Sequence, residues 1–234
     1  WKEKYPESVF VKDYKNLFHD LLPKLCLKLD SNRLYWPSSP GYDLSLPQTG
    51  QELNKGDVHY WGVWHGGDEL SSFTDNVGRF MSEYGMQSFP SPATVDYFCP
   101  SEEQDINSDI IKSHQKASLG NGNIMKYILM YYKEPKDFSS FVMLSQIMAG
   151  EAIKVAVESH RISMPYCMGS LYWQLNDCWP GASWSSLDYF GNWKALHYYA
   201  KKFFSPLLIC ADIQPEIVNV YVVNDGELIK KSKI

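Results

Sequence analysis

The sequence predicts an α/β fold in which short strands alternate with helices, followed by a C-terminal segment that contains only strands. Between residues 34 and 175, short runs of β-branched and aromatic residues are separated by segments with helical periodicity. After Pro206, two β-rich runs follow with no helical pattern between them. Because strands that are separated by helices pair in parallel, we expect the body of the chain to contain a parallel sheet covered by helices.

The first part of the chain is predicted to hold one helix and three strands. An amphipathic pattern over residues 9–25 indicates a helix. Three apolar runs follow at residues 34–36, 57–65 and 79–84, and each is closed by proline or glycine, which commonly end a strand. A long polar loop up to Gly56 separates the first two runs.

The second part is predicted to be mainly helical before a fourth strand. Residues 89–162 carry helical periodicity, and Ser101 with Gln104 forms a capping box at the start of one helix. The remaining elements are a strand over residues 169–175, a helix over residues 193–204, and two strands over residues 207–211 and 217–223. Four units of strand and helix are half of a (β/α)8 barrel, and such a half would leave two sheet edges to be covered.

The composition is that of a globular protein and gives no reason to expect nucleic acid or a membrane as partner. Hydrophobic residues make up 44% of the 234 residues, charged residues make up 21%, and the net charge is −5. The basic residues are scattered, and no apolar run approaches the roughly 20 residues that span a bilayer. The five cysteines are irregularly spaced without a CxxC motif, so we expect buried free thiols rather than disulfides or a metal site.

Aromatic residues are unusually frequent, with eight Trp, 16 Tyr and 11 Phe making up 15% of the chain. They can build a large core, because aromatic side chains bury the most area. They can also bind carbohydrate, because the C–H face of a sugar ring packs on a flat aromatic ring. Composition alone favours a role in the core, so only the positions of individual aromatic residues can indicate which of them bind carbohydrate.

Glu83 is a lone acid at the end of the apolar run over residues 79–84. One interpretation places it at the surface just past the strand, or pairs it with Arg79 on the same strand face. In a (β/α)8 barrel, however, residues at the carboxyl ends of strands face the active site. A carboxylate in that position can attack an anomeric carbon and form a glycosyl ester.

Residues 79–88, with the sequence RFMSEYGMQS, resemble the nucleophile strand of β-mannosidases. These enzymes belong to the large glycoside hydrolase family that also contains β-galactosidases and β-glucuronidases. Three further stretches resemble the fifth, sixth and eighth barrel strands of this family, at residues 35–40, 56–61 and 169–181. The four motifs occur in the family's order, and the resemblance covers nearly the whole chain.

The resemblance implies that residues 1–205 are the C-terminal half of a (β/α)8 TIM barrel, with strands five to eight. Residues 206–234 would then be the truncated start of a following β-sandwich domain. It also implies that Glu83 is the nucleophile of a retaining mechanism that releases terminal non-reducing β-D-mannose without a cofactor or metal. Trp173 matches the tryptophan that packs under the sugar.

Further substrate-binding candidates come from the predicted sixth strand and from the loop after the eighth. Alternation along a strand puts Trp61 and His65 on one face and Trp64 on the other. His65 is expected either to hydrogen-bond the nucleophile or a sugar hydroxyl, or to be structural, whereas His59 is expected to be a core histidine. The loop after Trp173 adds two candidates, Asp177 and Trp179.

The sequence departs from the family at the general acid/base. That residue should be a Glu that follows Asn at the end of strand four, and the 234 residues contain no Asn-Glu dipeptide. We therefore expect the acid/base to lie upstream of Trp1, in an N-terminal remainder of the same chain that completes the barrel. Residues 1–234 alone are expected to be inactive.

Two alternatives remain open. Another β-glycosidase of the same family, acting on galactosides, glucuronides or glucosaminides, would share the same fold, although the context of Glu83 fits mannosidases better than glucosaminidases. A non-catalytic carbohydrate-binding fragment could use Trp61, Trp173 and Trp179 without acid catalysis. The absence of an Asn-x-Ser/Thr sequon favours a bacterial periplasmic or cytoplasmic location over a lysosomal one.

Overall fold

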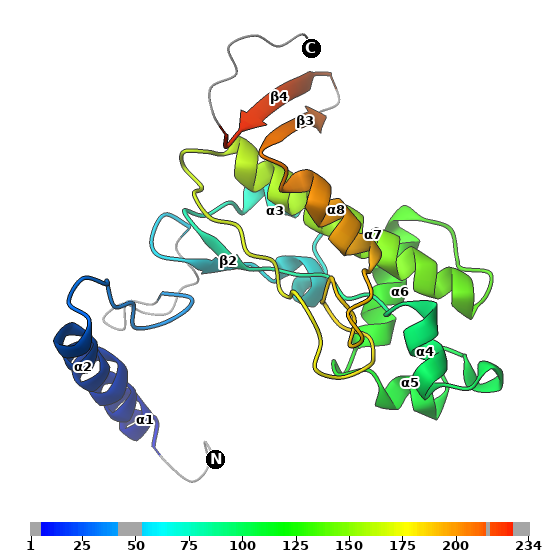
Figure 1. The fold of residues 1–234 in the computed structure, drawn as a ribbon, viewed down its shortest axis with the longest axis horizontal. Helices are drawn as coiled ribbons and strands as arrows, with labels where there is room; N and C mark the ends of the chain where they lie inside the picture. The colour runs from blue at the N-terminus through cyan, green and yellow to red at the C-terminus, as the bar shows by residue number, and fades with distance from the viewer. Residues whose placement is uncertain (1–5, 42–52, 214–215, 227–234) are drawn as a thin grey trace.

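The computed structural model describes residues 6–41, 53–213 and 216–226, from an N-terminal helix to a C-terminal β-hairpin (Figure 1). Most of the predicted polar loop before Gly56, and the outer ends of both predicted domains, lie outside these residues. The elements, in chain order, are α1 (Glu7–Tyr14), the π-helical segment η1 (Lys15–Leu21), α2 (Leu22–Leu29), β1 (Val58–His59), the π-type turn η2 (Gly62–Gly66), α3 (Ser72–Asp75), β2 (Met81–Glu83), α4 (Pro92–Phe98), the 3₁₀ turn η3 (Ser101–Glu103), α5 (Asp109–Ser113), α6 (Gly120–Tyr131), α7 (Phe138–Ile162), α8 (Ala195–Phe203), β3 (Leu207–Ile213) and β4 (Val218–Asn224).

Strand β2 lies between two parallel neighbours. On one side it pairs with β1, with Val58 opposite Met81 and His59 opposite Glu83. On the other side, residues 169–173 run parallel to β2, and the Met81 amide donates to the Gly169 carbonyl at 2.9 Å. The parallel pairing predicted from the sequence is thus confirmed for these three segments, and the middle one carries Glu83.

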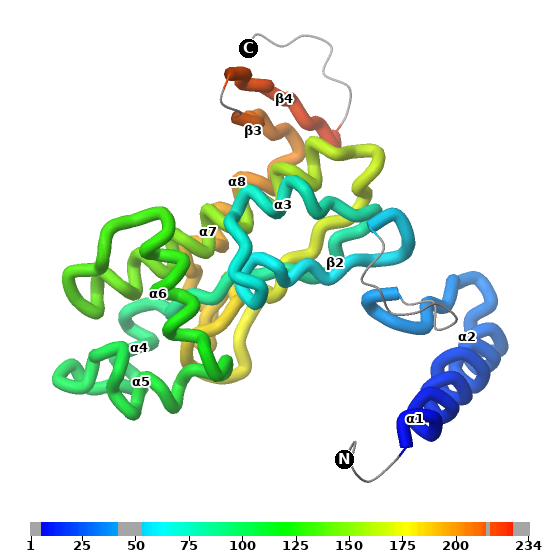
Figure 2. The backbone as a smooth tube through the Cα atoms, turned by 180° about the vertical axis from the view of Figure 1, so that it is seen from behind, coloured from blue at the N-terminus to red at the C-terminus, as the bar shows by residue number. Residues whose placement is uncertain are grey.

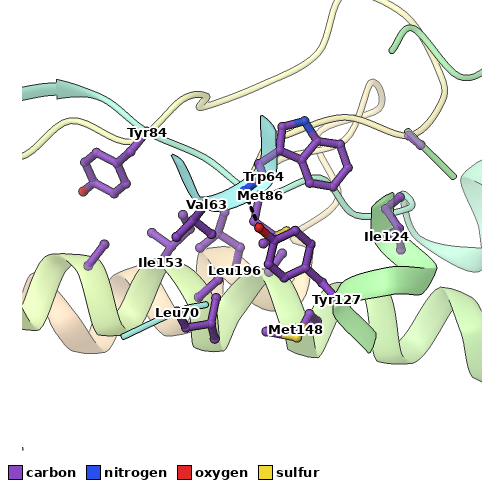
Figure 3. Packing of buried hydrophobic residues seen from close by; sticks show 14 of the residues in the cluster. Val63, Trp64, Leu70, Tyr84, Met86, Ile124, Tyr127, Met148, Ile153 and Leu196 are labelled. Carbon is purple, nitrogen blue, oxygen red and sulfur yellow. Dashed lines mark hydrogen bonds between the residues drawn. The ribbon is translucent and has the colours of Figure 1, made fainter. Parts of the chain in front are cut away.

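Helices α7 and α8 pack against each other along one face of the molecule, and both views show them side by side (Figure 1 and Figure 2). Small side chains let them approach closely, because a Cβ added at Gly150 of α7 would lie 2.7 Å from the Tyr199 ring of α8. The core beneath the strands is filled by large side chains from α6, α7, α8 and the strands, including Ile153, Tyr127 and Tyr84 (Figure 3).

Within the described residues, α7 is also long and apolar enough to suit a membrane span by length and composition alone. More than half of that apolar stretch, 56%, is buried inside the protein. The core helix of a globular protein meets the same two criteria, so this feature is weak evidence for a membrane partner.

The C-terminal strands β3 and β4 form an antiparallel hairpin, with Leu207 opposite Asn224 and Ile213 opposite Val218. Arg161 at the end of α7 joins this hairpin to the helices. Its guanidinium donates to the Phe203 carbonyl at 2.5 Å and pairs with Asp225 Oδ2 at 2.8 Å. The hairpin therefore follows directly on α8 and is tied to α7.

The first predicted helix is longer than expected, because helical backbone continues from Glu7 to Leu29. Pro23 lies inside this stretch, and the π-helical segment η1 immediately precedes it. A proline ring clashes with the carbonyl four residues earlier, and a wider π-helical turn is one way to accommodate it. None of the residues of α1, η1 or α2 is buried, and both views place this helix apart from the other elements (Figure 1 and Figure 2).

Three predicted strands are wrong in whole or in part. Over residues 169–175, only an isolated bridge between Ser170 and Met81 forms, although the segment runs beside β2. Residues 34–36 form no strand, and the Trp36 ring instead lies over Gly41 and Gly56, where added Cβ atoms would meet it at 2.7 and 2.8 Å. The predicted strand over residues 57–65 is reduced to β1, because the chain turns away after Trp61.

The capping box predicted at Ser101 and Gln104 is also wrong. Ser101 begins only the 3₁₀ turn η3, and the Gln104 side chain donates to Asp96 and to the Cys99 carbonyl. Helices α4, α5 and α7 are instead capped by side chains that accept a hydrogen bond from the amide three residues later, at Ser91, Ser108 and Asp137.

The contact between Gly85 and Trp173 generates a stability prediction. A Cβ at Gly85 would lie 2.4 Å from the Trp173 carbonyl oxygen, so backbone would have to move. We expect Gly85→Ala to lower the free energy of unfolding by about 1–3 kcal/mol, as overpacking does. The matched control is Gly122→Ala in α6, where a Cβ meets nothing within 4 Å. Because alanine favours helix, the control should raise the free energy of unfolding by about 0.5–1 kcal/mol. Urea denaturation of the full-length protein measures both, and equal midpoints for the two variants would contradict this packing.

Candidate active site

Glu83 is the last residue of β2, and its carboxylate is held from the neighbouring strand. Trp61 Nε1 donates to Glu83 Oε1 at 3.0 Å, and His59 Nδ1 lies 3.5 Å from Glu83 Oε2. The Glu83 side chain is 24% exposed, so it is sheltered and still reachable from solvent. A carboxylate with this access and a fixed orientation is suited to nucleophilic attack.

The alternative pairing of Glu83 with Arg79 is wrong. Arg79 is exposed, and its guanidinium carbon lies 4.5 Å from the centre of the Tyr166 ring. The reason is that β2 begins only at Met81, so Arg79 precedes the strand and the predicted strand face does not extend to it.

His59, predicted to be a core histidine, lies beside Glu83 instead. It is opposite Glu83 in the parallel register, and its second ring nitrogen, Nε2, is 2.9 Å from Ser39 Oγ and 3.6 Å from Asp57 Oδ2. The position that the sequence prediction gave to His65 is therefore occupied by His59.

Asp57 lies near the His59 ring nitrogen that points away from Glu83, and its carboxylate accepts three hydrogen bonds. Burial alone would raise the pKa of Asp57, but the bonds it accepts outweigh burial and hold that pKa below its ordinary value. The donors are Ser39 Oγ at 2.5 Å, Ser82 Oγ at 2.6 Å and the Gly41 amide at 2.8 Å. Asp57 is therefore an anion at neutral pH.

The turn after β1 brings Trp61 and His65 together. Their rings are 5.0 Å apart, in agreement with the predicted shared face, although a turn and not strand alternation produces the contact. His65 is exposed, and its aromatic neighbours are Trp61, Trp64 and Trp184. These contacts make His65 part of an aromatic rim, and its proposed hydrogen bond to a sugar hydroxyl stays a prediction.

Trp64 holds this turn in a rarely populated backbone conformation. Its φ is 84° and its ψ is −70°, which for a bulky residue costs on the order of 1–3 kcal/mol. Helix α6 secures it, because Tyr127 Oη accepts a bond from the Trp64 amide at 2.8 Å (Figure 3) and Asn123 donates to the Trp64 carbonyl at 3.1 Å. Tyr127 in turn donates to the Asp68 carbonyl at 2.9 Å.

Trp173 ends the parallel segment on the other side of β2. Its amide donates to the Tyr84 carbonyl at 2.7 Å, so it stands next to the residue that follows Glu83. The Trp173 side chain is 43% exposed, and the peptide bond to Gln174 is cis. An exposed ring at this strand end offers a flat apolar surface of the kind on which a sugar ring packs.

Asp177 organises the loop after Trp173. Its carboxylate accepts bonds from Ser183 Oγ at 2.7 Å, from Ser185 Oγ at 2.5 Å and from Gln174 Nε2 at 3.2 Å. These contacts are within the loop, so the structure gives Asp177 a role in shaping the loop. A direct contact with substrate stays a prediction.

Trp179 lies farther along the same loop and contacts the segment around α5. It stacks on His114 with ring centres 5.1 Å apart, and His114 stacks on Phe98 at 3.9 Å. Lys116 Nζ lies 4.4 Å from the centre of the Trp179 ring. Trp179 is still 45% exposed, so part of its ring remains available.

Lys194 was missed by sequence reasoning, because a single lysine before a helix carries no signal of burial. The side chain is fully buried, and its ammonium group donates to the Ser88 carbonyl at 3.0 Å and to the Ser183 carbonyl at 3.1 Å. Ser88 and Ser183 are also bridged by backbone hydrogen bonds. Lys194 thus ties the segment after Glu83 to the loop that carries Asp177 and Trp179.

Across residues 6–41, 53–213 and 216–226, no three His, Cys, Asp or Glu side chains come together as metal ligands would. The cysteines are free thiols, and Cys99, Cys167 and Cys210 are buried as expected, whereas Cys178 is exposed in the loop.

The chain is similar in sequence and in fold to known proteins. No family profile matches the chain. The chain is 33% identical over 235 residues to the β-mannosidase of Capra hircus, across 92% of this chain and 26% of that protein. It is 32% identical over 216 residues to β-mannosidase B of Aspergillus flavus, across 89% of this chain and 25% of that protein. A solved β-D-mannosidase from Dictyoglomus thermophilum matches with a TM-score of 0.84 and 37% identity, across 90% of this chain and 26% of that one.

The chain is β-mannosidase-like. It spans about a quarter of the length of the curated β-mannosidases that it matches. Its mixed fold of helices and strands matches that of the solved β-mannosidase, which confirms the α/β prediction at this level. An exo-chitosanase from Amycolatopsis orientalis, at 23% identity and a TM-score of 0.52, is similar in fold alone.

Lys194 gives this β-mannosidase-like chain a testable pH dependence. Burial lowers the pKa of Lys194 from 10.5 to about 8, against the attraction of Asp177 and Asp188. A lysine whose pKa is lower in the folded state binds fewer protons there than in the unfolded state, so its burial costs less as pH rises above 8. Relative to Lys194→Met, the wild type should gain about 1.4 kcal/mol of stability per pH unit above pH 8.

The measurement is urea denaturation of the wild type and Lys194→Met in the full-length protein at pH 7, 8, 9 and 9.5. Lys201→Met, which removes an exposed lysine of α8, is the matched control and should show no such trend. A constant difference between the wild type and Lys194→Met across this range would contradict the burial of the ammonium group.

Proposed function

We propose that the protein carrying this chain is a retaining β-glycosidase that hydrolyses terminal non-reducing β-D-mannose residues, with Glu83 as nucleophile. The observation that carries the proposal is the Glu83 carboxylate at the end of the central parallel strand, with Trp61 donating to one oxygen at 3.0 Å and His59 facing the other. The β-mannosidase relatives supply the substrate class.

The proposed architecture is the C-terminal half of a (β/α)8 barrel over residues 1–205 and the first strands of a β-sandwich over residues 206–234. The parallel order of β1, β2 and residues 169–173 supports the barrel, because β2 lies between the other two as a middle strand would. The β3–β4 hairpin supports the sandwich, because alternate side chains on both strands leave apolar residues exposed that further strands could cover.

In the proposed reaction, a Glu83 oxygen attacks the anomeric carbon and the bond from that carbon to the aglycone oxygen breaks. The leaving oxygen takes a proton from an acid/base that we place after an Asn, upstream of this chain. Water then attacks the glycosyl ester, gives a proton back to that acid/base and releases mannose in the β configuration. Glu83 leaves the cycle as a carboxylate, and no cofactor or metal takes part.

The proposed substrate contacts follow from the exposed aromatic rings. Trp173 supports the apolar face of the sugar bound at Glu83, and Trp61 orients the nucleophile. His65 lies on the rim of this site, and Trp179 lies where the loop meets the α5 region, with Asp177 shaping that loop.

Replacement of the nucleophile tests the proposal. Glu83→Gln in the full-length protein keeps the Trp61 contact but cannot form the glycosyl ester, so kcat/KM for an aryl β-mannoside should fall by several orders of magnitude. Glu102→Gln, an exposed glutamate of η3, is the matched control and should keep wild-type activity. Activity of Glu83→Gln within tenfold of the wild type would contradict the assignment.

Product stereochemistry tests retention separately, since proton NMR should detect β-mannose before it mutarotates. α-Mannose as the first product would contradict the proposed double displacement.

The substrate class is tested by measuring kcat/KM of the full-length protein for aryl β-glucosides, β-galactosides and β-glucuronides beside the aryl β-mannoside. A preference for any of them over the β-mannoside would favour another branch of the family.

The 234 residues on their own should show no steady turnover of 2,4-dinitrophenyl β-mannoside. Protonation of a leaving group is typically worth about 10²–10⁴-fold, and its proposed donor lies outside this chain. The open strand edges would also loosen Glu83, which catalysis needs fixed to about half an ångström. Steady turnover that Glu83→Gln abolishes would mean that another residue here acts as acid/base. A single burst with an adduct on Glu83 would contradict only the claim about positioning.

A further inference from the structure

His59 sits between two carboxylates, and the hydrogen-bond geometry determines which of its neighbours can donate. Ser39 Oγ lies 2.5 Å from Asp57 Oδ2 and 2.9 Å from His59 Nε2. A hydroxyl has one proton to donate and lone pairs to accept with, whereas an ionised carboxylate only accepts. Because Asp57 accepts, the Ser39 proton points to Asp57, and Ser39 Oγ accepts from His59.

His59 Nε2 therefore carries a proton, and the other ring nitrogen, Nδ1, faces Glu83. A ring that donates from Nδ1 as well carries two protons and is an imidazolium. Nδ1 lies 3.5 Å from Glu83 Oε2, across the parallel pair in which His59 is opposite Glu83. The Tyr60 amide donates to the Glu83 carbonyl at 2.8 Å, so the register that sets this distance is held by backbone. Two carboxylates lie within 4 Å of the ring nitrogens, those of Asp57, which directly precedes β1, and of Glu83, the last residue of β2.

We propose that His59 is a positioning residue for the nucleophile: as an imidazolium anchored by Ser39 and Asp57 through Nε2, it donates from Nδ1 to Glu83 Oε2. The inference rests on the proposed function of Glu83 and extends it. Trp61 holds Oε1 and His59 holds Oε2, so the carboxylate is restrained in rotation. A carboxylate held by only one of these groups could rotate away from the anomeric carbon.

The test uses two variants, His59→Asn and His59→Gln, in which a side-chain amide takes the place of one nitrogen of the His59 ring. The Asn amide nitrogen lies near the position of His Nδ1, and the longer Gln places its amide nitrogen near Nε2. His59→Asn therefore keeps a donor toward Glu83, whereas His59→Gln keeps the contact with Ser39 and loses the donor toward Glu83. The two variants differ by one methylene group, so each serves as the other's structural control.

The readout is the inactivation rate of the full-length protein by 2-deoxy-2-fluoro-β-D-mannosyl fluoride, which reports attack by Glu83 itself. Fluoride is a good leaving group, so the acid/base contributes little to this step. His59→Gln should be inactivated about 10- to 100-fold more slowly than the wild type, as expected for the loss of a bond to a charged group. His59→Asn should keep most of the wild-type rate, and KM for an aryl β-mannoside should change little in either variant.

Several outcomes would overturn the proposal. Wild-type inactivation rates in both variants would mean that His59 does not act on Glu83. Equally slow rates in both, with a lower unfolding temperature, would mean that His59 is only structural. Should neither variant fold, Ser39→Ala, which removes the acceptor of His59 Nε2, should slow inactivation more than Ser82→Ala, which removes another donor to Asp57. Equal rates for the two serine variants would then contradict the relay.

The same assay separates this proposal from the proposed function. Glu83→Gln should form no adduct at all. An adduct in Glu83→Gln would show that the nucleophile is elsewhere, whatever the His59 variants do. Loss of the adduct in Glu83→Gln together with wild-type rates in the His59 variants would leave Glu83 as nucleophile and reject His59 alone.

Discussion

The parallel pairing of β2 with its two neighbours is the constraint on which the candidate site depends. The bond from the Tyr60 amide to the Glu83 carbonyl sets one register, and the bond from the Trp173 amide to the Tyr84 carbonyl sets the other. Since parallel strands end at the same edge of a sheet, these two bonds place His59, Glu83 and Trp173 together. A shift of either neighbour by one residue would turn its side chains to the opposite face.

Polar groups inside the protein hold the turn and the loop that surround this edge. The strained backbone at Trp64 costs on the order of 1–3 kcal/mol, and its two bonds to α6 contribute about 0.5–1.5 kcal/mol each, so they can offset it. Lys194 holds the loop after Trp173 in place, because its buried ammonium group donates to the carbonyls of Ser88 and Ser183. Both sets of hydrogen bonds come from buried groups, so the exposed aromatic rings of the site remain available to a ligand.

Much of this arrangement could be predicted from the sequence, and the misses have physical reasons. The positions of β2, α7, α8 and the C-terminal hairpin follow from periodicity. The predicted roles of His59 and His65 were interchanged because the prediction extended strand alternation beyond Trp61, where the chain turns. No local pattern signals a positive φ at a tryptophan, because the contacts that stabilise it come from α6, about 60 residues later. The burial of Lys194 depends likewise on carbonyls distant in sequence.

The most direct measurement of the central claim is the identity of the residue that becomes covalently glycosylated. The full-length protein would be inactivated with 2-deoxy-2-fluoro-β-D-mannosyl fluoride, digested, and its peptides sequenced by mass spectrometry. We expect one sugar adduct per chain, on Glu83, in the peptide that contains Met81–Glu83. An adduct on another carboxylate, such as Asp57 or Asp177, would contradict it.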